Sequence, residues 1–289
     1  MLKRTLTAIL LIPPVVYLIG WSPKWLYIVA IIAGIVLALR EYFQLCRMMG
    51  LKVFACLGYV ASAILCAAQM FPRHASSAVV FLLVVFLLVI TIRALHGGVE
   101  LKEYLGAVTA TIFGILYIGL SLSCLIPIRF ATHIFEGSGA AGDGTALIPP
   151  LSSGSKVILL MFITIWAGDI FAYLVGRPFG RTPFFARISP RKTWEGALAG
   201  LAGSLVAAWA FAHWFWPAAG LKTIMILAAW LAIMGQVGDL VESAIKRGAN
   251  QKDSGTLLPG HGGFLDRIDS LIFAAPALWL ALFVLGSLS

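Results

Sequence analysis

The chain has 289 residues, of which 61% are apolar and 11% are charged. An ordinary soluble domain carries about 25% charged residues, so this composition excludes a soluble globular enzyme. A membrane-spanning helix needs about 20 mainly apolar residues, and the chain is long enough for about nine such helices. The formal net charge of +9 favours anionic partners such as lipid headgroups and phosphates. We expect no nucleic-acid partner, because there is no soluble basic domain to bind one.

Apolar runs separated by polar interruptions predict an all-α protein with nine membrane spans. Helix is expected for each run, because backbone groups in hydrocarbon must be hydrogen-bonded within their own segment. The first run could alternatively be a signal peptide, but it lacks a small-residue cleavage pattern. The second and eighth runs are short. In chain order, the predicted spans cover residues 5–21, 25–39, 53–70, 78–95, 105–126, 157–175, 197–215, 223–239 and 270–288.

The distribution of Lys and Arg predicts the orientation of these spans. With a cytoplasmic N-terminus, 16 of the 21 Lys and Arg residues lie on the cytoplasmic side, where positive residues are retained. The Gly-, Ser- and Ala-rich stretch 136–155 is expected to connect two halves, an N-terminal transmembrane region over residues 1–150 and a C-terminal catalytic transmembrane region over residues 151–289. The second region has two cytoplasmic loops, 176–196 and 243–269. The expected location is a bacterial inner membrane, with the active site facing the cytoplasm.

Carboxylates gather in the C-terminal half, where seven of the twelve lie between Asp169 and Asp269. Asp169 lies inside an apolar run, where an ionisable side chain costs at least about 2.5–3.5 kcal/mol unless it is paired. It is therefore expected to be functional, with a structural pair to Arg177 as the alternative. Asp239 ends the eighth predicted span, and Glu242 follows three residues later on the same helical face.

Asp266 and Asp269 stand at the start of the ninth predicted span and also share a face. Capping of that helix is the simpler alternative for this pair. Carboxylates from three spans at one membrane level repel one another unless a cation lies between them. Oxygen ligands without a His or Cys pair point to Mg²⁺, with a second cation as an option. The predicted metal ligands are Asp169, Asp239, Asp266 and Asp269.

Two basic loops that contain glycine accompany these acids. Loop 176–196 carries five positive charges and Trp194, whose indole suits a membrane interface or a stacked base. Loop 243–269 combines Lys and Arg with a glycine cluster, whose backbone amides can approach an anion closely. Cytoplasmic loops of membrane proteins are rich in Lys and Arg whatever their function. This tendency does not explain the glycines beside paired aspartates.

Loop 243–269 resembles the signature of the CDP-diacylglycerol synthases (phosphatidate cytidylyltransferases). A second element of that family is similar to SPRKTWEG at 189–196, with Arg191 in place of a Lys. Residues 1–150 match the family only by being apolar and multi-spanning. The fixed positions of the signature are present as Ser243, Lys246, Arg247, Lys252, Asp253, Gly255, Pro259, His261, Gly262, Gly263, Asp266, Arg267 and Asp269.

The resemblance implies transfer of CMP from CTP to phosphatidic acid, which gives CDP-diacylglycerol and pyrophosphate. It implies catalytic roles for Asp239, Asp266, Asp269 and Lys252. Because the attacking phosphate is already ionised near neutral pH, His261 is expected to bind or orient substrate and not to act as a base. The implied substrate-binding residues are Arg191, Lys192, Ser243, Lys246, Arg247, His261, Gly262, Gly263 and Arg267.

Other functions stay open at this stage. A polyprenol or phytol-type lipid kinase would transfer the γ-phosphate of a nucleotide to an alcohol. A CDP-alcohol phosphotransferase lacks support, because its Asp-Gly-x-x-Ala-Arg element is absent. A membrane transporter is the third alternative, although the acids gather in one half only. The expected partners are CTP, phosphatidic acid and membrane lipids. The oligomeric state is open, with a homodimer as one option.

Overall fold

The computed structural model describes residues 12–71, 75–96, 99–131, 134–135, 151–257 and 262–285. The chain divides into two compact units. Unit 1 comprises Met1–Pro23, Ile128–Ser243 and Asp269–Ser289, and unit 2 comprises Lys24–Pro127 and Ala244–Ile268. These units are defined by compactness, and the functional division of the chain at residue 150 stays a prediction.

The expected all-α, polytopic membrane fold is confirmed. In the described part of the chain, seven helical segments are long and apolar enough to cross a membrane. A shorter apolar helix, α3, occupies the third predicted span. Residues 12–20 of the first predicted span are helical, and residues 5–11 lie outside the described residues. The total of nine spans and the side of the N-terminus stay predictions.

Unit 2 is built mainly from the helices between residues 24 and 127. Its core joins four of these elements through buried apolar side chains such as Leu65, Ile90 and Ile115. The Tyr42 hydroxyl donates to the carbonyl of Ala110 at 3.0 Å and so ties the first helix of the unit to the fourth. The elements are α2 (Lys24–Met48), α3 (Ala55–Ala68), α4 (Ala75–Leu95), α5 (Leu101–Gly114), the π-helix η2 (Ile115–Leu120), α6 (Ser121–Ser123) and the start of α7 (Leu125–Phe130).

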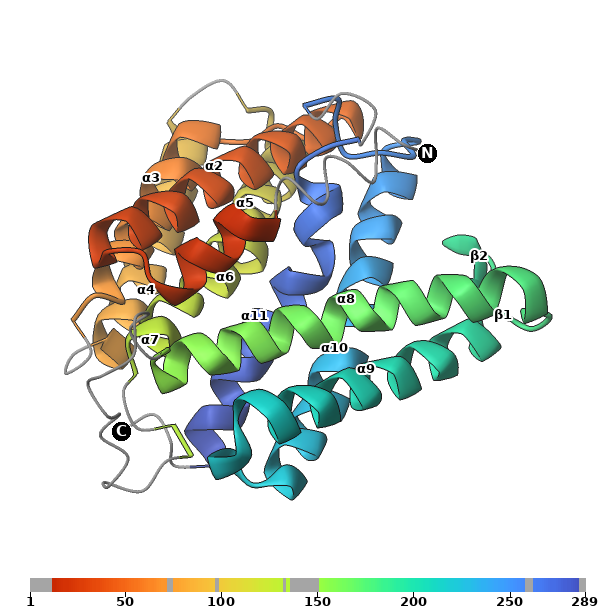
Figure 1. Cartoon of the computed structure of the whole chain (residues 1–289). Helices are drawn as coiled ribbons and strands as arrows, with labels where there is room; N and C mark the ends of the chain where they lie inside the picture. The colour runs from red at the N-terminus through yellow and green to blue at the C-terminus, as the bar shows by residue number, and fades with distance from the viewer. Residues whose placement is uncertain are drawn as a thin grey trace. The chain divides into compact units, whose positions relative to one another are not determined.

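Unit 1 is organised around α8 and α9, which run side by side (Figure 1). The side chains of Ser152 and Thr193 cap these two helices by accepting backbone N–H groups of their first turns, each at 3.2 Å. The Ser204 hydroxyl donates to the carbonyl of Thr164 at 2.7 Å and links the pair at mid-length. The elements are α8 (Ser153–Phe179), β1 (Pro183–Phe185), β2 (Ser189–Thr193), α9 (Trp194–Phe215), the 3-10 helix η3 (Pro217–Ala219), most of α10 (Leu221–Gly248) and most of α11 (Leu265–Val284).

Two details of the sequence prediction were wrong. The second and eighth predicted spans are not short, since α2 has 25 residues and α10 has 28. Asp239 therefore lies nine residues before the end of α10 and not at its end. Hydropathy falls where polar residues begin, but Glu, Lys and Arg are good helix formers, so each helix continues past its apolar run. Loop 176–196 also contains an antiparallel hairpin, β1–β2.

We predict that the α8–α9 pair depends on the absence of a side chain at Gly200. A Cβ atom added there would lie 2.9 Å from the carbonyl oxygen of Gly168 and 3.1 Å from Cβ of Ala172. Gly200→Leu should lower stability by about 1–3 kcal/mol through overpacking, measured as the midpoint of thermal unfolding in detergent. Leu198→Ala changes an exposed residue of the same helix and should leave the midpoint nearly unchanged. Equal midpoints for both variants would contradict the close packing of α8 on α9.

Candidate functional site

Helices α10 and α11 approach each other closely at Gly238. A Cβ atom at this position would lie 2.7 Å from the carbonyl oxygen of Asp269 and 3.1 Å from Cβ of Phe273. Only glycine leaves room for such an approach of two backbones. Asp239 and Glu242, which follow Gly238 on α10, are thereby placed opposite Asp269 of α11.

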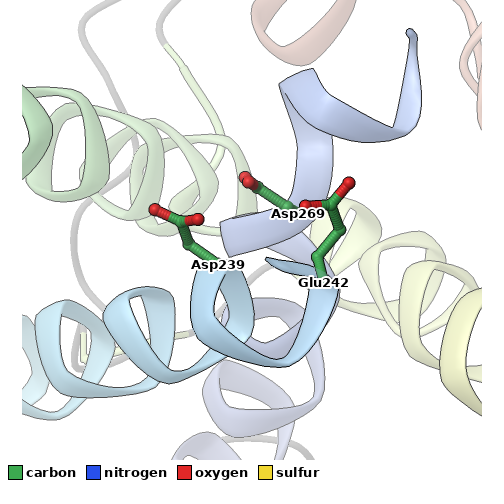
Figure 2. Close-up of side chains that lie close together, drawn as sticks. All are labelled: Asp239, Glu242 and Asp269. Atoms are coloured by element: carbon green, nitrogen blue, oxygen red, sulfur yellow. The ribbon is translucent and has the colours of Figure 1, made fainter. Parts of the chain in front are cut away.

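Three carboxylates from these two helices form a cluster, which we call the carboxylate cluster: Asp239, Glu242 and Asp269. Each offers one oxygen, and these oxygens lie within 4.8 Å of one another. Figure 2 shows Asp239 and Glu242 on α10 beside Asp269 on α11. Glu242 is fully buried, and the two aspartates are partly buried. Like charges so close together favour a bound cation, and an all-oxygen donor set fits a hard divalent ion.

Lys192 and Asp169 accompany the carboxylate cluster within unit 1. The Lys192 ammonium on β2 forms an ion pair with Asp239. Asp169, on α8, interacts electrostatically with both Asp239 and Lys192. The alternative partner for Asp169 was Arg177, but this guanidinium donates to the hydroxyl of Tyr173 at 2.6 Å. Asp169 thus lies within the electrostatic range of Asp239, and its functional role stays a prediction.

The SPRKTWEG element positions Lys192 through the β-hairpin. Pro183 pairs with Thr193 across the two strands, so the hairpin ends where α9 begins. The backbone N–H and the hydroxyl of Thr182 both donate to the carboxylate of Glu195, at 3.2 and 3.0 Å. The ring of Phe184 packs edge-on against Trp194, with 4.4 Å between centroids. These contacts fix the strand that carries Lys192.

Asp266 lies in unit 2, where hydrogen-bond donors surround its carboxylate. Lys246 Nζ donates to it at 2.6 Å, and the backbone N–H groups of Gly263 and Ser254 donate at 2.7 and 2.9 Å. The side chains of Lys246 and Asp266 are only 11% and 9% exposed. Such charge-assisted hydrogen bonds in a buried position are strong. Lys246, expected to hold substrate phosphate, is paired with Asp266 in this structure.

Sequence reasoning missed Glu41, a buried acid of α2 in unit 2. Its carboxylate accepts hydrogen bonds from the Ser254 hydroxyl and from the backbone N–H groups of Phe264 and Leu265, at 2.8 to 2.9 Å. A lone acid just beyond an apolar run was the available signal. Glu242 was noted for its spacing from Asp239, but it was not included among the predicted metal ligands.

The other predicted site residues fall into four groups. The Ser243 hydroxyl lies 3.4 Å from Asp239 Oδ1, within unit 1. Gly262 has a φ of +79°, which favours glycine, and Gly263 packs against Ser254. His261 lies outside the described residues. The exposed cations are Arg191, Arg247, Lys252 and Arg267.

Comparison with known proteins places these features in a family. Residues 2–285 match the cytidylyltransferase family. A phosphatidate cytidylyltransferase of Synechocystis sp. is 34% identical over 269 residues, which cover 88% of this chain and 87% of the relative. Phosphatidate cytidylyltransferase 5, chloroplastic, of Arabidopsis thaliana is 33% identical over 263 residues, which cover 86% of this chain and 64% of that relative. A phosphatidate cytidylyltransferase of Bacillus subtilis is 43% identical over 136 residues, which cover 45% of this chain and 49% of the relative.

We predict that Mg²⁺ stabilises the folded protein by binding the carboxylate cluster. A ligand that binds only the folded state adds about 2.7 kcal/mol at 100 times its Kd, so millimolar Mg²⁺ should raise the midpoint of thermal unfolding in detergent. Asp269→Asn and Glu242→Gln each remove a ligand charge and should abolish most of this increase. Glu103→Gln changes an acid of unit 2 that pairs with Lys52 and should retain it. A wild-type midpoint unmoved by Mg²⁺ would refute the site.

Proposed function

Because the chain belongs to the cytidylyltransferase family, we propose that it transfers CMP from CTP to phosphatidic acid. The products are CDP-diacylglycerol, a precursor in phospholipid biosynthesis, and pyrophosphate. The observation that supports this proposal best is the carboxylate cluster, whose acids come from α10 and from the signature aspartate Asp269. Lys192, from the second family element, lies in the same unit and pairs with Asp239.

The proposed reaction is an in-line substitution at the α-phosphorus of CTP. A phosphate oxygen of phosphatidic acid forms the new P–O bond, and the bond from the α-phosphorus to the oxygen that bridges to the β-phosphorus breaks. The electron pair leaves with pyrophosphate. The nucleophile is a phosphate monoester, which carries about 1.5–2 negative charges at neutral pH, so no side chain needs to remove a proton.

We propose Asp239, Glu242 and Asp269 as the residues that hold Mg²⁺, with Asp169 of the same unit as a further predicted ligand. The predicted ligand role of Asp266, which belongs to unit 2, stays a prediction. Mg²⁺ would neutralise charge on the triphosphate and stabilise the leaving pyrophosphate. Lys192 would offset charge on a substrate phosphate near Asp239. The exposed cations Arg191, Arg247, Lys252 and Arg267 would bind the remaining phosphates of CTP and of the lipid.

The active site is proposed to face the cytoplasm of a bacterial inner membrane. The positive-inside distribution supports this orientation, and CTP is a cytoplasmic nucleotide. The similar protein of Arabidopsis thaliana is chloroplastic by name, so a chloroplast membrane is the alternative location. A reporter fused after Ser289 should read as external, and a cytoplasmic reading would overturn the nine-span topology.

Product analysis with labelled CTP tests the activity itself. The purified protein is incubated in detergent with phosphatidic acid, a polyprenol, Mg²⁺ and CTP labelled either in cytidine or in the γ-phosphate. Cytidine label should enter the chloroform phase, and the γ label should leave as pyrophosphate. A chloroform-soluble γ label without cytidine would instead identify a lipid kinase. Absence of both lipid products would overturn the proposal.

We predict that individual signature cations bind substrate beyond the general positive charge of the loops. Lys252→Gln and Arg247→Gln should each raise the KM for CTP or phosphatidic acid by about tenfold, since a neutral amide replaces a charge-assisted contact. Arg187→Gln is the matched control, because Arg187 is equally exposed but lies outside both family elements. Equal and mild losses at all three positions would mean that the loops act only as a diffuse electrostatic surface.

A further inference from the structure

We propose that Glu41 is a positioning residue for the signature segment. It lies in α2, outside both family elements, and holds Ser254 and the first turn of α11 so that Asp266 keeps its place. Its kinetic consequence rests on the function proposed above, whereas its structural consequence does not. All residues of this argument belong to unit 2.

The first observation is that the buried carboxylate of Glu41 is satisfied by backbone N–H groups of the signature segment. The residue is 4% exposed, and a buried carboxylate is stable only where donors surround it. Oε1 accepts the backbone N–H of Phe264 at 2.9 Å, and Oε2 accepts that of Leu265 at 2.8 Å. These N–H groups belong to the N-terminus of α11, where no intrahelical carbonyl is available to them. A negative charge is also favoured there by the helix dipole.

The second observation is that Ser254 connects Glu41 to Asp266. The Ser254 hydroxyl donates to Glu41 Oε2 at 2.8 Å, and its oxygen accepts the backbone N–H of Asp266 at 3.3 Å. The backbone N–H of Ser254 donates to the Asp266 carboxylate at 2.9 Å. One buried serine therefore contacts both acids. A shift of Glu41 should be transmitted through Ser254 to Asp266.

The third observation concerns two glycines of the signature. A Cβ atom added at Gly255 would lie 2.7 Å from Glu41 Oε1. A Cβ atom added at Gly263 would overlap Glu41 Oε2 and the Ser254 hydroxyl. Both glycines thus pack directly on the Glu41 carboxylate. The signature segment therefore leaves room for the side chain of an acid that lies far earlier in the chain. The hydrogen bonds of Glu41 to this segment span 213 to 224 residues.

Hydrogen exchange tests this positioning role without reference to activity. Glu41→Gln keeps the size of the side chain but offers one acceptor oxygen in place of two and turns an amide NH₂ toward N–H donors. In the full-length protein in detergent, backbone amides of the peptide spanning 262–268 should exchange at least about tenfold faster in this variant.

Glu103→Gln is the matched control for exchange. It removes another acid of unit 2, one that pairs with Lys52 at 3.1 Å. Its 262–268 peptide should exchange at the wild-type rate. Exchange in Glu41→Gln that equals wild type would overturn the proposal. Exchange raised over the whole of unit 2 in Glu41→Gln would also overturn it, because Glu41 would then only support the fold.

A double-mutant cycle tests the connection through Ser254. Glu41→Gln and Ser254→Ala should each lower kcat by about tenfold or more, with the KM for CTP nearly unchanged, after correction for the folded fraction. The double variant should lose little more than the larger single loss, because both changes break one chain of contacts. Multiplied losses would overturn the connection. A wild-type protein without cytidylyltransferase activity would refute the proposed function, and the exchange experiment would still decide the role of Glu41.

Discussion

A carboxylate among apolar helices must be given donors or a cation, and this requirement organises both units. The two units meet it in different ways. In unit 2, Glu41 and Asp266 are surrounded by backbone N–H groups, a hydroxyl and the ammonium of Lys246. In unit 1, three acids lie within 4.8 Å of one another, and Lys192 pairs with one of them. The first arrangement is self-sufficient, whereas the second concentrates negative charge at one point and favours an added cation.

Close backbone approach is what allows side chains this short to meet. Asp and Glu reach only a few ångströms from their helix axes, so two helices that share a cluster must lie unusually near each other. Gly238 permits this for α10 and α11 beside the carboxylate cluster, and Gly200 permits it for α8 and α9. Gly263 serves the same purpose in the signature segment, where it leaves room for Glu41. Small residues at helix contacts are typical of membrane proteins, and here they also set the positions of the acids.

The apolar runs of the sequence predicted the fold class, and Asp239 and Asp269 stood out as acids at the borders of two such runs. The structure places these two acids together. Helix ends were predicted less well, since hydropathy marks only the apolar part of α10, which continues to Gly248. The β1–β2 hairpin is too short to produce a clear alternating pattern. Glu41 was missed because its partners lie more than 200 residues away, a separation on which local spacing carries no information.

The capping alternative for the signature aspartates holds in part, because Asp266 lies in the first turn of α11 and accepts the backbone N–H of Gly263 at 2.7 Å. The N-terminus of α11 does need an acid, and helix-dipole arguments favour one in its first turn. The amides of Phe264 and Leu265 nevertheless bind Glu41, from another helix of the same unit. Asp266 is thereby left to receive Lys246 and the amide of Ser254. A cap supplied by α2 has a consequence that a local cap would not have: we expect the signature segment to keep this conformation only when α2 is folded beside it. Residues in the N-terminal half, which carry no recognisable motif, would then help to shape the signature segment of the C-terminal half.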